Sequence, residues 1–122
     1  MTARVVVLAQ DLIWADRLAV AVKAAGGEPV RAASLGRFTE ALAGGDAAIV
    51  DLTARAYDGV AAIAAAHAAG TRVLAVGQHD DHALRKRALA AGADRVFAYR
   101  KLFEDGPGTI SAWLARPAGI AL

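Results

Sequence analysis

Along the chain, short continuous apolar runs alternate with longer segments in which apolar residues recur at helical spacing. Short apolar runs rich in Val, Ile, Leu and Ala, the clearest of them at residues 4–9, 47–52 and 72–77, have the character of buried strands in a parallel sheet. Between them, apolar residues recur at helical spacing, as at Trp14, Leu18 and Val22, with charged residues interspersed. The predicted strands are residues 4–9, 29–33, 47–52, 72–77 and 95–99. The predicted helices are residues 11–25, 36–43, 57–69 and 81–91, with a last helix that follows Gly106 and Pro107.

This regular strand–helix alternation predicts an α/β fold. Strands joined by helical crossovers pair in parallel, with helices on both faces of the sheet. We therefore predict a flavodoxin-like three-layer sandwich of five parallel strands and five helices, as one domain over residues 1–122 with a core at 4–115 and a frayed tail at 116–122. Functional groups in such a sheet lie beyond the carboxyl ends of the strands. The residues expected at that edge are Gln10, Asp11, Asp51, Thr53, Gly77 and Tyr99.

Composition narrows the possible chemistry. The 122 residues are 57% hydrophobic and 21% charged, which suits one domain with a substantial core. The chain has no cysteine, which excludes disulfides, thiolate nucleophiles and cysteine-bound zinc. It has no apolar run of transmembrane length and no signal-peptide pattern, so we predict a soluble, cytoplasmic protein without membrane partners. The net charge of +2 gives no support for direct nucleic-acid binding.

Two segments carry a resemblance to a known family. Residues 46–52 (Asp-Ala-Ala-Ile-Val-Asp-Leu) and residues 90–94 (Ala-Ala-Gly-Ala-Asp) are similar to the third strand and to the loop before the fifth strand of response regulator receiver domains. The resemblance covers residues 4–114 and implies that Asp51 occupies the phospho-acceptor position. In that family, phosphoryl transfer to the carboxylate requires a divalent cation and positive charge near the phosphoryl oxygens.

The supporting positions depart from the family's pattern. Where receivers carry an acidic pair after the first strand, this chain has Ala9 and Gln10 followed by Asp11, so only Asp11 and Asp51 remain for a weak Mg²⁺ site. The two switch positions also differ, because Gly77 stands where a Ser or Thr is usual and Tyr99 where the family has its lysine.

Lys101 is a candidate replacement for the missing lysine, displaced by two residues. If it lies on the same strand, its side chain sits about 7 Å farther along. It could then reach the phospho-acceptor position only across a bulge.

Other candidate sites have plainer interpretations. The turn after the first strand lacks the glycines of a dinucleotide or P-loop site. His79, Asp80, Asp81 and His82 could form a metal cluster, but we favour an aspartate that caps the next helix beside two solvated histidines. His67, in an alanine-rich helix, is interpreted as a packed or solvated residue. Trp14 and Trp113 are interpreted as core or helix-packing residues.

Basic residues cluster late in the chain. Arg85, Lys86, Arg87, Arg95, Arg100 and Lys101 form either a solvated surface or a patch for protein partners. In receivers, the face built by the fourth helix, fifth strand and fifth helix mediates docking, so the resemblance favours the patch.

The sequence supports three hypotheses about function. The first is a pseudo-receiver, a non-enzymatic signalling module without a cofactor that binds a protein partner such as a histidine kinase, an output domain or a second copy. The second is an active phospho-acceptor that is phosphorylated on Asp51 with Mg²⁺. The third is a flavodoxin-like domain that binds a small ligand, which predicts a sizeable pocket at the carboxyl ends of the strands.

Overall fold

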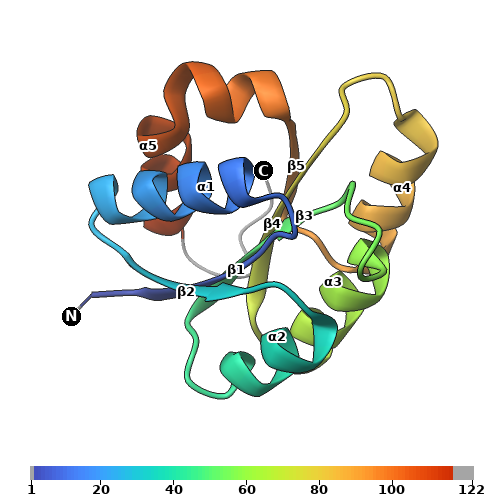
Figure 1. Ribbon diagram of the computed structural model, residues 1–122, viewed down its shortest axis with the longest axis horizontal. Coiled ribbons are helices and arrows are strands. Elements are labelled where there is room, and N and C mark those ends of the chain that lie inside the picture. Colours follow the sequence, from blue (N-terminus) through green and yellow to red (C-terminus); the bar gives the residue numbers. More distant parts are fainter. Residues whose placement is uncertain (1, 117–122) are drawn as a thin grey trace.

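The computed structural model describes residues 2–116 and contains five strands and five helices in strict alternation (Figure 1). The strands are β1 (Arg4–Leu8), β2 (Glu28–Ala32), β3 (Ala47–Asp51), β4 (Arg72–Gly77) and β5 (Arg95–Ala98). The helices are α1 (Leu12–Ala24), α2 (Leu35–Leu42), α3 (Gly59–Ala68), α4 (His82–Ala91) and α5 (Tyr99–Ala115). Most bounds lie within two residues of the predicted ones. Among the described residues, no helix has the length and apolar character needed to cross a membrane.

All five strands pair in parallel in one sheet with the order β2-β1-β3-β4-β5. The predicted flavodoxin-like architecture is therefore confirmed. The strand order reverses between β1 and β3, because the chain first adds β2 on one side of β1 and then β3 on the other. The carboxyl ends of β1 and β3 therefore meet at the position where ligand sites form in such sheets.

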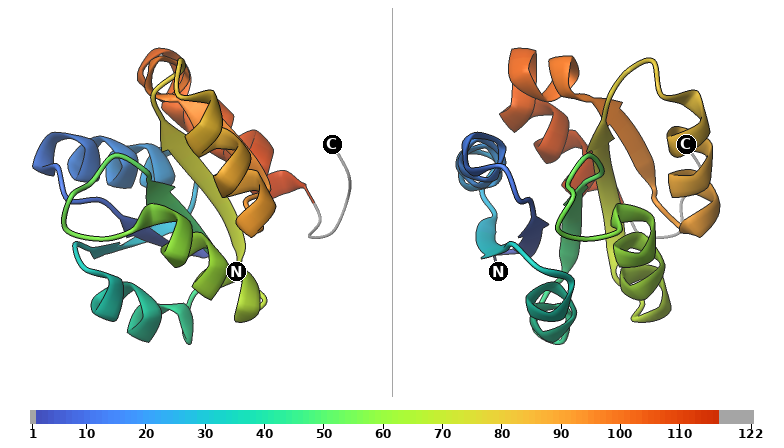
Figure 2. Two further views of the ribbon diagram at one scale, coloured as in Figure 1. Left: turned by 90° about the vertical axis from the view of Figure 1, so that its right-hand side faces the viewer. Right: turned by 45° about the vertical axis from the view of Figure 1, so that its right-hand side comes forward.

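Helices cover both faces of the sheet, which explains why the central strands are continuously apolar. Val5 and Val7 point towards α1 and α5, whereas Val6 and Leu8 point towards α2 and α3. Figure 2 shows α1 and α5 together on one side of the sheet and α2, α3 and α4 on the other. All five residues of β3 are buried, so the last of them, Asp51, is placed rigidly.

Side-chain caps define where the helices begin. The carboxylate of Asp11 accepts a hydrogen bond from the Trp14 amide at 3.0 Å, and that of Asp81 accepts one from the Leu84 amide at 3.1 Å. Ser34 and Asp58 cap α2 and α3 in the same way. Each such cap contributes about 1 kcal/mol. The prediction that one of Asp80 and Asp81 caps the next helix is confirmed, and the cap is Asp81.

The fifth strand and helix differ from the prediction. The strand was expected to include Tyr99, with the helix starting only after Gly106, but β5 ends at Ala98 and α5 begins at once. The reason is register: Ala98 pairs with Gly77, the last residue of β4, so a longer strand would have no partner.

The predicted helix start appears instead as a break inside α5. Asp105 has non-helical dihedral angles (φ −152°, ψ 69°), and its carboxylate accepts a hydrogen bond from the Gly108 amide at 3.0 Å. Pro107 then lies in the first turn of the second helical segment, where its missing N–H costs nothing. Of the tail that was expected to be frayed, residues 117–122 lie outside the described residues.

The C-terminal end of α5 is fixed by Arg72. Its guanidinium donates to the carbonyl oxygens of Trp113 and Arg116, both at 2.5 Å, and lies 5.3 Å from the centre of the Trp113 ring. The indole N–H of Trp113 donates to Asp94 at 3.2 Å. Trp113 is only 3% exposed, which confirms that it is a core residue.

Candidate functional site

Asp51 ends the central strand β3 and is 3% exposed, although its carboxyl group faces a cavity at the carboxyl edge of the sheet. This cavity has a volume of about 530 Å³. It is lined by Gln10, Asp11, Trp14, Asp51, Thr53, Ala54, Arg55, Gln78 and Tyr99. Five of the six residues predicted at this edge from the sequence are thus brought together, and Gly77 is the exception.

The carboxylate of Asp51 already has several hydrogen-bond donors. Its Oδ1 atom accepts from the amide and from the hydroxyl of Thr53, each at 3.2 Å, and from the hydroxyl of Tyr99. The hydroxyls of Tyr99 and Thr53 also contact each other. Among residues 2–116, no lysine or arginine forms an ion pair with Asp51. The carboxylate is held by neutral donors only.

Tyr99 reaches Asp51 because it is the first residue of α5, immediately beyond β5. Its ring packs against Trp14 of α1, with 4.7 Å between the ring centres. Burial raises the pKa of the Tyr99 hydroxyl well above its ordinary value, and the hydrogen bond to the Asp51 carboxylate raises it further. The phenol therefore remains a protonated donor at neutral pH.

A second tyrosine, which the sequence reading assigned only to a helix, lies beneath Asp51. The hydroxyl of Tyr57 donates to the main-chain oxygen of Asp51 at 2.7 Å and lies 3.2 Å from that of Leu8. It therefore joins the ends of β3 and β1. Burial, followed by the negative charge of Asp51, raises the pKa of Tyr57. The only signal for this role in the sequence was the residue type, because a tyrosine that becomes buried needs a hydrogen-bond partner for its hydroxyl.

Gln10 links the end of β1 to the loop between β3 and α3. Its side-chain oxygen accepts hydrogen bonds from the amides of Arg55 and Ala56, at 2.9 and 3.0 Å. This residue stands where the resemblance places part of an acidic pair. Its amide carries no charge, and its oxygen is already used to hold the loop.

Only Asp11 and Asp51 are acidic among the residues that line the cavity. The Asp11 carboxylate caps α1, and Oδ1 of Asp51 already accepts three hydrogen bonds. Within residues 2–116, no three His, Cys, Asp or Glu side chains are grouped so that they could hold a metal ion. The suggested histidine cluster is therefore not formed, and His67, His79 and His82 are exposed. A weak Mg²⁺ site at Asp11 and Asp51 stays a prediction.

The two remaining switch positions do not lie at this cavity. Gly77 is buried against Leu52, whose Cδ1 would lie 3.3 Å from an added Cβ. The displaced-lysine hypothesis for Lys101 is wrong in its geometry, because Lys101 lies in a helix and not on a strand. Residues two apart in a helix point to opposite sides. Tyr99 therefore faces Asp51, while Lys101 faces a different cavity between β5 and α5.

The six basic residues of the predicted patch have different surroundings. Arg85, Lys86 and Arg87 are exposed on α4. Arg95 is partly buried and, with Lys101, lines the cavity between β5 and α5. Arg100 is exposed and pairs with Glu104 at 2.6 Å. The exposed α4 side chains and Arg100 remain candidates for partner contacts, whereas Arg95 and Lys101 belong to a concave site.

Comparison with known proteins shows the fold. No family model matches the chain, and neither does any curated protein. Among solved structures, the BeF3-activated receiver domain of DrrB has a TM-score of 0.82 at 15% identity, covering 95% of this chain and all of that one. The signal receiver domain of the response regulator NarL from Mycobacterium tuberculosis has a TM-score of 0.77 at 23% identity, covering 94% of this chain and 98% of that one.

A third similar structure contains a phosphorylated aspartic acid. A response regulator from Burkholderia pseudomallei with a phosphorylated aspartic acid, a calcium ion and citrate has a TM-score of 0.71 at 18% identity. The match covers 98% of this chain and 77% of that protein. The chain therefore has the receiver-domain fold of two-component response regulators, with Asp51 at the end of its central strand.

Proposed function

We propose that this chain is a signalling domain with the receiver fold that acts by binding a protein partner and is not switched by phosphorylation of Asp51. The observation that carries the proposal is the hydrogen bond from the Tyr99 hydroxyl to the Asp51 carboxylate. A phosphoryl group entering at Oδ1 would have to displace this donor and the two donors of Thr53.

The charge around Asp51 supports the same conclusion. Transfer of a phosphoryl group to a carboxylate brings additional negative oxygens to a site that already holds Asp11 and Asp51. The groups that donate to the Asp51 carboxylate are all neutral: the Tyr99 phenol and the amide and hydroxyl of Thr53. Arg55 is the one cationic residue that lines the cavity, and it is exposed on a loop, where its charge is screened by water.

The partner follows from the receiver fold and from the exposed basic residues. A histidine kinase, an output domain and a second copy of the chain are the classes of protein partner that receivers use. Arg85, Lys86 and Arg87 form a basic stretch on α4 that fits an acidic surface. In this proposal the domain performs no catalysis of its own and requires no cofactor.

The proposal is tested by titrating the protein with beryllofluoride and Mg²⁺ and following amide shifts by NMR. The expected result for the wild-type chain is no saturable shift at Asp51, Thr53 or Gln78. Tyr99→Lys, which returns a cation to this position, should bind beryllofluoride more tightly than the wild type. The control Tyr99→Lys/Asp51→Asn should lose that gain.

Two results would contradict the proposal. Saturable, Mg²⁺-dependent shifts in the wild-type protein that disappear in Asp51→Asn would establish an active phospho-acceptor. Shifts at the same residues from a small organic ligand, without Mg²⁺ or beryllofluoride, would support the third hypothesis, because a volume of about 530 Å³ lies within the range of small-molecule sites.

A further inference from the structure

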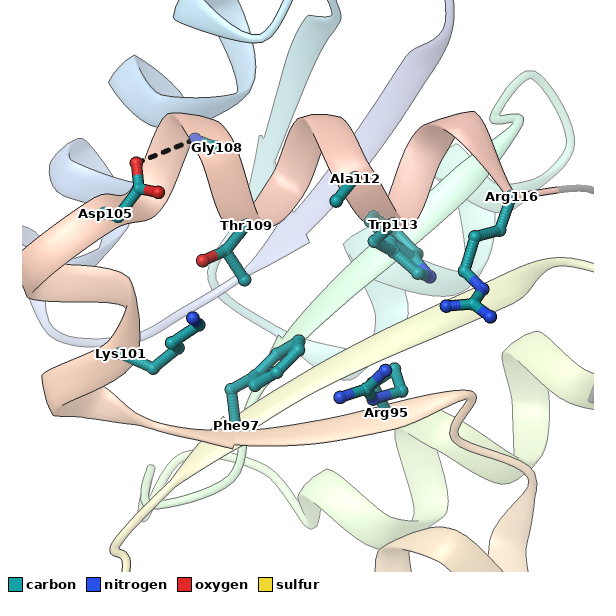
Figure 3. Close-up of a pocket in the computed structure, with 9 residues that line it drawn as sticks. All are labelled: Arg95, Phe97, Lys101, Asp105, Gly108, Thr109, Ala112, Trp113 and Arg116. Atoms are coloured by element: carbon teal, nitrogen blue, oxygen red, sulfur yellow. Dashed lines mark hydrogen bonds between the residues drawn. The ribbon is translucent and has the colours of Figure 1, made fainter. Parts of the chain in front are cut away.

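A second cavity lies between β5 and the C-terminal part of α5 (Figure 3). Its volume is about 250 Å³. It is lined by Arg95 and Phe97 of β5 and by Lys101, Asp105, Gly108, Thr109, Ala112, Trp113 and Arg116 of α5 and its end. None of these residues lines the Asp51 cavity, so this is a separate site.

The charge of this cavity is positive. The half-buried Arg95 and the exposed Lys101 and Arg116 contribute three cations, and Asp105 contributes one carboxylate, which already accepts a hydrogen bond from the Gly108 amide. Within residues 2–116, none of the three cations forms an ion pair. Like charges that share a concave site repel one another and attract an anion.

The walls of the cavity include two aromatic rings, each held in place. The Arg95 guanidinium lies 4.8 Å from the centre of the Phe97 ring, so one face of this ring is covered by a cation. Trp113 is fixed by Arg72 and Asp94. Rigid aromatic walls of this kind favour a flat apolar group, because little side-chain freedom is lost when such a group binds.

Thr109 adds an unused polar group. The residue is 7% exposed, and its hydroxyl has no hydrogen-bond partner within the described part of the chain. In a regular helix a threonine hydroxyl can bond the carbonyl oxygen three or four residues earlier, but the residue four positions before Thr109 is Asp105, where the helix is broken. Figure 3 shows the Thr109 side chain projecting from α5 towards Phe97 and Lys101. A buried hydroxyl without a partner is rare and is satisfied when an occupant supplies one.

We propose that this cavity binds a small organic anion, a carboxylate or phosphate monoester carried on a flat apolar body. The cations Arg95 and Arg116 contact the anionic group, and the rings of Phe97 and Trp113 contact the body. The volume lies just below the usual range for ligand pockets, which limits the body to about one aromatic ring. The proposal goes beyond the function proposed above and holds whether or not Asp51 is phosphorylated.

The test uses the full chain with phenyl phosphate and benzoate as probes. Trp113 fluorescence reports on the site directly in a Trp14→Phe background, because the protein has only two tryptophans. We expect saturable changes with both probes, weaker changes with inorganic phosphate, and none with phenol, which lacks the charge. Arg95→Gln and Arg116→Gln should each weaken binding about tenfold, since each removes a charge-assisted hydrogen bond.

Arg87→Gln is the matched control, because Arg87 is an exposed arginine of α4 that does not line the cavity. It should bind both probes as the parent does. Equal weakening in all three glutamine variants would overturn the proposal, since it would show only a general attraction to a basic surface. The absence of a saturable change at millimolar probe in the folded parent would also overturn it. Thr109→Val, which leaves every charge in place, should weaken binding less than Arg95→Gln.

Discussion

Replacing Tyr99 by phenylalanine tests whether the Asp51 carboxylate is held as the structure shows. The change removes one hydroxyl and keeps the ring that packs against Trp14. A hydrogen bond to a charged group contributes about 1.5–3 kcal/mol. Two donors from Thr53, its amide and its hydroxyl, remain on the same oxygen. We therefore expect Tyr99→Phe to lower the free energy of unfolding by about 1.5–2 kcal/mol, the lower end of that range.

Urea unfolding in a double-mutant cycle with Asp51→Asn isolates this bond. The coupling energy between the two substitutions should be about 1 kcal/mol or more, because removing the charge removes most of what the phenol stabilises. Tyr57→Phe is the control: its hydroxyl donates to main-chain oxygens and not to the carboxylate, so its coupling to Asp51→Asn should be less than half as large. A coupling near zero for Tyr99 would refute both the hydrogen bond and the argument that Oδ1 of Asp51 is held by its present donors.

Three further predictions concern the surroundings of the site. The free energy of unfolding should keep its full value below pH 10 and fall above pH 10 by about 1.4 kcal/mol per pH unit for each of Tyr57 and Tyr99. The cause is that the raised pKa values keep both tyrosines protonated in the folded chain, while those of the unfolded chain ionise. Urea unfolding measured between pH 9 and 11 checks this, and a flat profile contradicts it. Gln10→Ala should speed hydrogen exchange of the two amides in the β3–α3 loop roughly fivefold, which corresponds to a hydrogen bond of about 1 kcal/mol. Gly92→Ala should lower the free energy of unfolding by more than about 1–2 kcal/mol. That figure is the approximate cost of placing alanine in the left-handed backbone conformation of Gly92, and the new Cβ would in addition lie 2.5 Å from the ring of His67. Unchanged thermal stability would contradict this prediction.

The hydrophobic pattern was sufficient to predict the fold because the central strands β1, β3 and β4 are built from short apolar runs and the crossovers from helical ones. It also placed Asp51 at the carboxyl edge, since β3 is buried along its whole length and can end only where polar residues begin. A cap at Asp80 or Asp81 was readable for a similar reason, because a cap depends on contacts within about three residues, whereas the cap at Asp11 was not predicted.

Contacts between residues that are far apart in the sequence could not be predicted from it. Gln10 holds the amide of Arg55 across 45 positions of sequence, and the hydroxyls of Tyr57 and Tyr99 reach Asp51 only because of strand register and helix direction. The start of α5 was missed because strand propensity continues through Tyr99, whereas β4, the pairing partner, ends at Gly77. Sequence reasoning thus named most residues of the site but not the bonds among them.

The short first segment of α5, from Tyr99 to the break at Asp105, stands between the two cavities. Tyr99 faces one and Lys101 the other, and only a single residue separates them. A helical turn bounded by a strand at one end and a break at the other has few ways to move except as a unit. A ligand that binds in one cavity and rotates or fixes this turn therefore changes the free energy of the contacts that the turn makes in the other cavity. Since such coupling is reciprocal, an anion that tightens the Tyr99–Asp51 contact must itself bind more tightly when that contact is formed.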